Sequence, residues 1–328
     1  MPKCATELED EVLRVAVALD RCARPWRDAV VSAGSLARFA QAAGTRGVLE
    51  GLLNEAKAGW GTRAAEFRRS LDAVDVRRER SFMQELGVGL IERGDAEYPP
   101  MLAASPDPPA ALWVRGRLLP TDAWSVAIIG ARRASAYGIE QAGRLAATIA
   151  AAEVVIVSGA ARGIDAEAHR GALRAEGRTI AVVGGGLANP YPPEHVELLD
   201  EIVTSGGGVI SECPMFAEAT PDRFPSRNRI IAAQSLGTLV VEAAIRSGAI
   251  ITANMAAELG RLCMALPGPV STGRSTGCHH LIQAMQATLI ESADDVLRLL
   301  VEHASTVAGA EALARAGLVR DAQFQPRP

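Results

Sequence analysis

The sequence predicts an α/β protein with a Rossmann-like, doubly wound, mostly parallel sheet, preceded by a small domain made only of helices. Short runs rich in β-branched residues begin near residue 123, and a turn containing Gly, Ser or Pro follows each run. Most of these turns lead into a segment with helical character. Strands that alternate with helices and are apolar along almost their whole length are typical of a parallel sheet covered on both faces.

Helical spacing is the only regular pattern in the N-terminal part of the chain. Apolar residues recur at this spacing at Leu8, Val12, Val15 and Leu19, and again at Leu49, Leu52 and Leu53. We therefore expect a small domain of short helices over residues 1–80, and we assign it to the SAM-like or helix-hairpin-helix-like class. The proline-rich stretches Asp95–Leu102 and Ser105–Pro109 predict a connector over residues 81–122 that packs on the core.

The core is predicted to span residues 123–303. Its expected strands are Val126–Ile129, Val154–Val157, Thr179–Val183, Val209–Ile210, Thr238–Val241 and Leu262–Leu266. The amphipathic segment Ser292–His303 is expected to be the last helix, with Ser292 at its N-cap. We expect residues 304–328 to be a tail that is too short for a winged-helix domain.

Bulk composition limits the function and the location. The net charge is −4, so any positive surface for a polyanion has to be local. The five cysteines are scattered without C-x-x-C spacing, so neither a disulfide framework nor a zinc site is expected. The acidic start has no apolar signal segment, and no apolar run approaches the roughly 18 residues of a membrane span. We therefore expect a cytoplasmic protein without membrane contact.

The unusual residues follow the predicted strands, where an open α/β sheet binds its ligands. They lie in the turns Gly130–Gly138, Ser158–Asp165, Gly184–Pro192, Phe224–Arg229, Ser247–Thr252 and Pro267–Pro269. Main-chain N–H groups and helix dipoles make such turns anion sites, glycine allows close approach, and arginine supplies a two-pronged donor. Neither G-x-G-x-x-G nor G-x-x-x-x-G-K-[ST] is present, so the motifs predict a phosphate site without naming the ligand.

The polar groups in these turns also have purely structural explanations. Gly184–Gly186 is equally typical of a tight strand-to-helix turn. Asp165 fits an N-cap, and His169, four residues later, fits an ion-paired or capping side chain, as alternatives to acid/base roles. Surface salt bridges are the structural alternative for Arg227 and Arg229.

The same holds for the acidic and aromatic side chains near the turns. Glu212 and Glu242 follow strands, where the ordinary role of a carboxylate is to pair with a nearby arginine. Tyr137, Tyr191 and Phe224 are suited to stack on bases, but packing inside the protein is the default explanation for them.

Taken in order along the chain, these turns resemble the DNA-processing protein A (DprA/Smf) family from about Gly87 to Leu300. The motifs that carry the resemblance are Gly87–Leu102, Asp107–Gly116, Val126–Arg132, Ser158–His169, Phe224–Ile231, Ser247–Ala253, Gly260–Arg261, Pro267–Gly268 and Gly277–Ile282. The resemblance implies a non-catalytic, cytoplasmic homodimer that protects incoming single-stranded DNA during natural transformation and loads the RecA recombinase. It also implies that no cofactor, metal or membrane is involved.

The resemblance further implies which residues form the site. Arg132 matches the family's principal strand-binding arginine, and the Tyr191–Pro192 turn matches a second DNA-contacting loop. His279 and Ile282 match the dimer interface. The expected contacts to DNA or phosphate are Gly130, Arg132, Arg133, Ser158, Gly159, Gly184, Gly185, Tyr191, Arg227, Asn228, Arg229, Ser247, Gly248 and Thr252.

The second loop departs from the family pattern. Many relatives have a lysine or an asparagine there, whereas this chain has Pro193, Glu194 and His195. Glu194 is expected to repel phosphate, which predicts a weaker contact or one made by the main chain alone.

Two other functions are compatible with the fold. Nucleoside-monophosphate phosphoribohydrolases of the cytokinin-activating (LOG) type use an arginine before a helix and a glutamate after a Pro-Gly-Gly turn, which invites comparison with Arg229 and Glu242. The segment Gln234–Glu242 lacks Pro-Gly-Gly and has one extra residue, which turns a strand side chain to the other face. The third possibility is a module that binds a mononucleotide without turnover.

Overall fold

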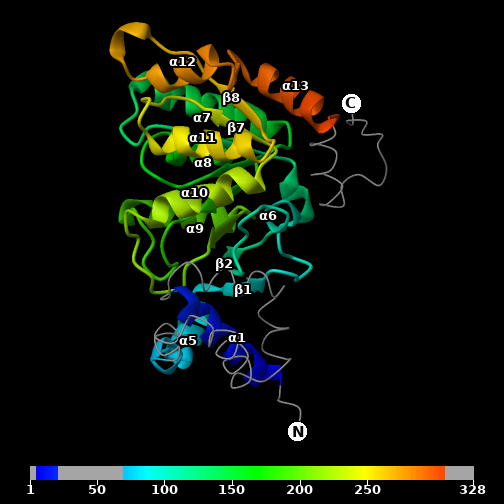
Figure 1. The fold of residues 1–328 in the computed structure, drawn as a ribbon, viewed down its shortest axis with the longest axis vertical. Coiled ribbons are helices and arrows are strands. Elements are labelled where there is room, and N and C mark those ends of the chain that lie inside the picture. Colours follow the sequence, from blue (N-terminus) through cyan, green and yellow to red (C-terminus); the bar gives the residue numbers. More distant parts are fainter. Residues whose placement is uncertain (1–4, 21–68, 307–328) are drawn as a thin grey trace, which may run out of the picture.

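The computed structural model describes residues 5–20 and 69–306 and places nine strands in one mixed sheet (Figure 1). The strands are β1 (Val88–Glu92), β2 (Ala111–Gly116), β3 (Ser125–Ile129), β4 (Val155–Ser158), β5 (Thr179–Val182), β6 (Gly208–Ser211), β7 (Gly237–Val240), β8 (Leu262–Ala265) and β9 (Thr288–Leu289). Their order across the sheet is β1-β2-β6-β5-β4-β3-β7-β8-β9. β2 pairs antiparallel with β1 and β6, and the other neighbours are parallel. The predicted mostly parallel, Rossmann-like sheet is confirmed.

Helices cover both faces of the sheet. The α-helices of the described ranges are α1 (Ala5–Asp20), α5 (Val76–Leu86), α6 (Pro100–Ala103), α7 (Ala136–Ala151), α8 (Ile164–Arg174), α9 (Val196–Thr204), α10 (Arg223–Gln234), α11 (Gly248–Glu258), α12 (Thr276–Gln283) and α13 (Ala293–Ala304). In β3, Val126 and Ile128 pack in one core with residues of α7, α8 and α13. Ala127 and Ile129 point the other way, into a core with residues of α10 and α11. Burial on both faces explains why the strands are apolar at almost every position.

The strand order reverses between β3 and β7. From β3 the chain adds β4, β5 and β6 on one side, whereas β7 lies against the other side of β3 and is followed by β8 and β9. The turns after β3 and β7 therefore diverge at the carboxyl edge of the sheet. A crevice at such a reversal is where open α/β sheets bind ligands.

The segment 81–122, predicted as a connector, contributes to the sheet itself. β1 and β2 come from this segment and form an antiparallel edge beside β6. The proline-rich part between them folds back on itself, because the Tyr98 hydroxyl donates to the Pro109 carbonyl at 2.7 Å. The segment predicted as a connector that packs on the core thus also supplies two strands of the sheet.

The described N-terminal helices lie beside β1 (Figure 1). Asp20, the last residue of α1, pairs with Arg223 of α10 at 2.7 Å, which ties α1 to the core. α5 continues to Leu86, so the predicted domain boundary at residue 80 falls inside a helix, and the division into domains stays a prediction. The expected helix around Leu49–Leu53 and the expected tail from residue 307 lie outside the described residues.

The last helix begins where the sequence predicts it. The Ser292 side chain accepts from the Asp295 N–H, and the Asp295 carboxylate accepts in return from the Ser292 N–H, so the two residues form a capping box. This reciprocal arrangement satisfies two main-chain donors at the start of α13.

Two kinds of feature are absent from residues 5–20 and 69–306. No helix there combines the length and the apolar character needed to cross a bilayer. No group of three or more His, Cys, Asp or Glu side chains there is placed to hold a metal ion. Cys213, Cys263 and Cys278 of the same ranges are free thiols.

Candidate functional site

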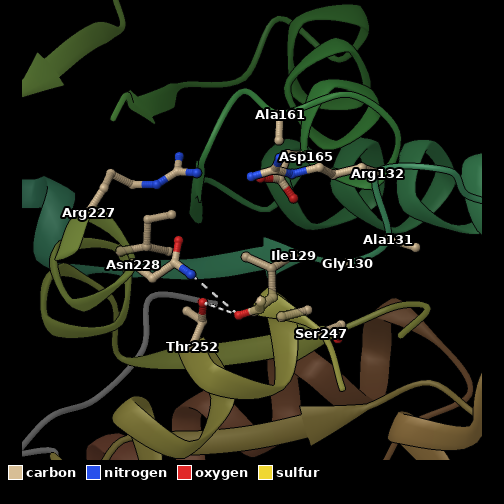
Figure 2. A pocket seen from close by; sticks show the side chains of 13 residues that line it. Ile129, Gly130, Ala131, Arg132, Ala161, Asp165, Arg227, Asn228, Ser247 and Thr252 are labelled. Atoms are coloured by element: carbon tan, nitrogen blue, oxygen red, sulfur yellow. Dashed lines mark hydrogen bonds between the residues drawn. The ribbon is translucent and has the colours of Figure 1, made fainter. Parts of the chain in front are cut away.

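Three neighbouring cavities at the carboxyl edge of the sheet share the side chain of Arg132, and we call them together the rim groove. The first, of about 230 Å³, lies at the reversal between β3 and β7 (Figure 2). Its polar lining consists of Arg132, Asp165, Arg227, Asn228, Ser247 and Thr252. The second is lined by Arg132, Gly159, Arg162, Gly184, Tyr191 and Phe224, and the third, of about 450 Å³, adds Pro221, Pro225 and Ile251.

Two buried side chains of opposite charge form the floor of the rim groove. Asp165 lies in the first turn of α8 and Arg227 on α10, and both side chains are almost fully buried. Burial raises the pKa of the Asp165 carboxyl, and the positive charge of Arg227 opposes that rise. Burial also lowers the pKa of Arg227 to about 10. Each charge thus offsets part of the cost of burying the other.

The pair also joins three turns. The Arg227 guanidinium donates to the carbonyls of Gly159 and Val182, at 2.5 Å each, and so links the ends of β4 and β5. The main-chain N–H groups of Gly130 and Ala161 lower the pKa of the Asp165 carboxyl, so the turns after β3 and β4 both approach this carboxyl. The two charges are therefore structural clamps as well as lining residues.

Close approach of the turns depends on glycine at one conspicuous position. Gly163, the residue before α8, has a φ of 79°, and a Cβ there would lie 2.2 Å from the Ala131 carbonyl oxygen. A side chain at residue 163 would push the turn after β4 away from Arg132. The sequence thus places Arg132 against the start of α8.

Arg132 rests on an aromatic ring. Its guanidinium carbon lies 4.5 Å from the ring centroid of Phe224, and Figure 2 shows the guanidinium extending across the first cavity towards Arg227. Arg132 is exposed, so its charge faces solvent and the groove at once. Cation–π contact holds such a side chain without neutralising its charge.

A second loop closes the other side of the groove. The Tyr191 ring lies 6.0 Å from that of Phe224 and is 41% exposed. His195, in the short helix η3 (Pro193–His195), donates from Nδ1 to the Ala160 carbonyl at 2.8 Å, which fixes the loop to the turn after β4. The two aromatic rings and Arg132 thus form a mixed apolar and cationic wall.

The first cavity also contains polar atoms without partners. Among the described residues, the buried Arg227 Nε and Ser247 Oγ have no hydrogen-bond partner. Asn228 and Thr252 both donate to the Gly248 carbonyl, at 3.3 and 3.0 Å (Figure 2), which ties α10 to the first turn of α11. Unpaired buried donors facing a cavity are what an anion or a water is expected to satisfy.

The structure brings most of the expected contacts into one groove. The predicted residues that line it are Gly130, Arg132, Gly159, Gly184, Tyr191, Arg227, Asn228, Ser247, Gly248 and Thr252. Their role in binding is a proposal taken up below. The sequence analysis missed Arg162, which lines the same groove. The orientation of its side chain depends on Glu194, which lies in a different loop.

Four predicted contacts lie elsewhere. The guanidinium of Arg229 is held by Asp107 at 2.9 Å and by Glu212 at 2.5 Å, so the salt-bridge alternative is correct for this residue. The Ser158 hydroxyl is buried and donates to the Ile128 carbonyl at 2.6 Å, which makes it a link between strands. Arg133 and Gly185 are the remaining two, and neither lines the groove.

The residues that invited comparison with the hydrolases do not form a site. Glu242 is buried and accepts from the main-chain N–H of Ser135 at 2.9 Å and from the Ser135 hydroxyl, at the N-terminus of α7. Arg229 is paired as described above. Neither residue lines the groove, so the structure does not assemble this arginine–glutamate pair around a cavity.

Several open alternatives are now decided by geometry. Asp165 is not the N-cap of α8, which is Gly163. His169 is fully buried and donates from Nδ1 to the Thr179 hydroxyl oxygen at 2.7 Å, and burial lowers its pKa to about 3. Tyr137 donates to the Pro267 carbonyl at 2.9 Å, which is a packing role.

The expected interface residues lie on α12, near the β9 edge of the sheet. His279 is half-buried and its Nε2 lies 2.9 Å from the Gly268 carbonyl oxygen, and Ile282 is half-buried too. Met285 and Leu289 nearby are exposed to 92% and 44%. This end of the sheet therefore presents apolar surface.

Comparisons with known proteins point to one family. Residues 89–301 match the family model described as DNA recombination-mediator protein A. Protein Smf of Escherichia coli (strain K12) is 43% identical over 212 residues, which cover 64% of this chain and 56% of that protein. The DNA processing protein DprA of Streptococcus pneumoniae (strain ATCC BAA-255 / R6) is 42% identical over 200 residues, which cover 61% of this chain and 70% of that protein. The chain thus spans little more than half the length of the E. coli protein.

Solved structures agree with the sequence comparison. The X-ray structure of DprA from Streptococcus pneumoniae matches with a TM-score of 0.64 and 37% identity, over 72% of this chain and 81% of that one. A structure of DNA processing protein A from Helicobacter pylori, which describes the single-stranded DNA binding mode of that protein, matches with a TM-score of 0.58 and 27% identity. It covers 66% of this chain and 96% of the Helicobacter chain.

Proposed function

The chain belongs to the DNA recombination-mediator protein A family, and from that premise we propose that it binds single-stranded DNA in the rim groove. The observation that carries the proposal is the meeting of Arg132, the Gly184 turn and Arg227 at one edge of the sheet. These residues come from the turns after β3 and β5 and from α10, so only the folded sheet gathers them.

The groove offers the two kinds of contact that a single strand requires. Arg132 and the main-chain N–H groups at the start of α11 supply cationic and dipolar contacts for phosphates. Tyr191 and Phe224 supply rings on which unpaired bases stack. A duplex keeps its bases inside, so it gains the phosphate contacts but not the stacking. Preference for a single strand follows.

We also propose the finer function that the resemblance implies. The protein protects single-stranded DNA in the cytoplasm, passes it to RecA during natural transformation and catalyses no reaction on it. It acts as a homodimer through the surface that contains His279 and Ile282, where the exposed Met285 and Leu289 supply apolar area. The helical region over residues 1–80 is proposed as a separate domain.

A competition experiment tests the proposal. A labelled single-stranded oligonucleotide is bound to the protein and then displaced with unlabelled single strand or with duplex of the same length and sequence. We expect the single strand to compete at lower concentration, and we expect affinity to fall linearly with the logarithm of salt concentration. Equal competition by duplex, or an affinity independent of salt, contradicts the proposal.

A further inference from the structure

Arg162 lies in the rim groove, but its guanidinium is already bound to a carboxylate of the protein. Its Nε and Nη2 donate to the two carboxylate oxygens of Glu194, the second at 3.0 Å. Its Nη1 donates to the Tyr191 hydroxyl at 3.1 Å, and its guanidinium carbon lies 5.4 Å from the Tyr191 ring centroid. The Nε–Nη2 fork of the guanidinium, the edge that suits a carboxylate or a phosphate, is therefore satisfied by Glu194 within the second loop.

The Arg162–Glu194 pair lies on the proposed path of the DNA strand. Arg162 shares the second cavity with Arg132, Tyr191 and Arg227, so Glu194 holds a cation that lies on the proposed path of the strand. A carboxylate offers two oxygens to the arginine fork in the same planar geometry as two phosphate oxygens. Glu194 thus occupies the position in which a phosphate of the strand would meet Arg162.

The pair is also easy to open. The side chains of Arg162 and Glu194 are 47% and 48% exposed, and exposed ion pairs contribute little to stability because water and salt screen them. The hydrogen bond from Arg162 lowers the pKa of the Glu194 carboxyl, so the carboxyl is charged at neutral pH.

We propose that Arg162 is a further phosphate-binding residue and that Glu194 is an internal competitor that a strand must displace from it. This inference rests on the proposed function, because it assumes that a strand lies in the rim groove. In the free protein Glu194 neutralises Arg162. In the complex a backbone phosphate takes the arginine, and Glu194 turns to solvent. Glu194 lowers the affinity for the strand. Because Arg162 is already neutralised in the free protein, its contact with a phosphate adds little to the release of counterions and so to the salt dependence of binding.

Four variants test the competitor by single-stranded DNA binding across a salt series. Glu194→Gln removes the competing charge, and Glu197→Gln is the matched control, because Glu197 is exposed in the first turn of α9. Arg162→Gln removes the proposed contact. The double variant Arg162→Gln/Glu194→Gln keeps the formal charge of the wild type.

We expect Glu194→Gln to bind about two- to fivefold more tightly at low salt, which is the equivalent of one exposed ion pair. The slope of log affinity against log salt should steepen by about 0.7, the value for one added single-strand phosphate contact. The double variant should lose both gains, and Arg162→Gln should bind more weakly than the wild type because Glu194 is left unpaired beside the strand.

The outcomes separate this inference from the function on which it rests. The inference is overturned if Glu194→Gln binds no more tightly than the wild type, if Glu197→Gln gains as much, or if the double variant keeps the gain. Glu194→Ala should reproduce the gain, and thermal unfolding of each variant confirms that all are folded. If the wild type itself does not bind single strands, the proposed function fails. If the wild type binds and Arg132→Ala weakens it while Glu194→Gln changes nothing, only this inference fails.

Discussion

Arg227 fills the space that a side chain on Gly159 would need: an ideal Cβ at residue 159 would lie 2.1 Å from Arg227 Nη1 and 2.6 Å from Asp165 Oδ2. The absence of a side chain there lets the turn after β4 close over the two buried charged groups. The groove that Arg132 overhangs therefore depends on a contact between a glycine and an arginine 68 positions apart in the chain.

Gly159→Ala tests this relationship through stability. We expect the substitution to lower the free energy of unfolding by about 2 kcal/mol or more, because the added methyl group overpacks against buried charged groups that cannot move freely. Chemical denaturation measures the change. Gly89→Ala is the control, since a Cβ at residue 89 meets only the Val114 carbonyl oxygen at 4.0 Å. Similar, small effects for both variants would show that the clamp at Gly159 is not tight.

Arg229→Met tests whether Arg229 stabilises the fold rather than binding DNA. Its removal breaks the ion pairs with Asp107 and with the half-buried Glu212, so we expect a loss of about 2–4 kcal/mol in the free energy of unfolding. Below its unfolding transition the variant should bind single-stranded DNA as the wild type does. A fully stable variant that no longer binds DNA would return Arg229 to the site.

The burial of His169 predicts a dependence of stability on pH. Burial lowers the pKa of His169 to about 3, whereas the unfolded chain binds that proton near pH 6.5. Between these values the unfolded state holds more protons, so the free energy of unfolding falls as the pH falls, by about 1.4 kcal/mol per pH unit at most.

Unfolding at pH 7, 6 and 5 is the measurement for His169, compared between the wild type and His169→Gln. The difference between the two proteins should shrink as the pH falls, because the variant lacks the group that loses protons on folding. His280→Gln is the control, since this side chain is exposed. If His169→Gln keeps the full pH dependence of the wild type, His169 is not its source.

The proposed dimer predicts a change in mass. Ile282→Glu places a charge in the surface beside Met285 and Leu289, and burying a carboxylate there is costly, so the variant should be a monomer in sedimentation or light-scattering measurements. Leu119→Glu is the control, an exposed apolar residue in a different part of the chain. A monomeric wild type, or a dimeric Ile282→Glu variant, argues against this interface.

The parallel core was predictable because its signals are local. Each of the strands from β3 to β8 is a short apolar run followed by a turn, and burial on both faces leaves no other pattern. β1 and β2 lie in the segment with the proline-rich turns. β1 has one fully buried position, whereas β2 begins with four buried apolar residues, Ala111–Val114, a run that the neighbouring prolines obscured. Their place in the sheet depends on pairing with β6, which is distant in sequence.

The sequence predicted which turns form the site but not which arginines are paired with a carboxylate. The pattern after each strand indicated Arg132 and Arg227, because carboxyl ends of parallel strands share one edge. The pairing of Arg229 with Asp107 spans 122 positions, and that of Arg162 with Glu194 spans 32. No local pattern distinguishes an arginine that has such a partner from one that lacks it.

The most direct test of the rim groove is the binding of a fluorescent single-stranded oligonucleotide by Arg132→Ala and Arg144→Ala, followed by anisotropy over a salt series. Arg144 is exposed on α7 and does not line the groove, so its variant should match the wild type. Arg132→Ala should bind at least about fivefold more weakly, with a salt slope shallower by about 0.7. Wild-type affinity and slope in a folded Arg132→Ala variant would contradict the account.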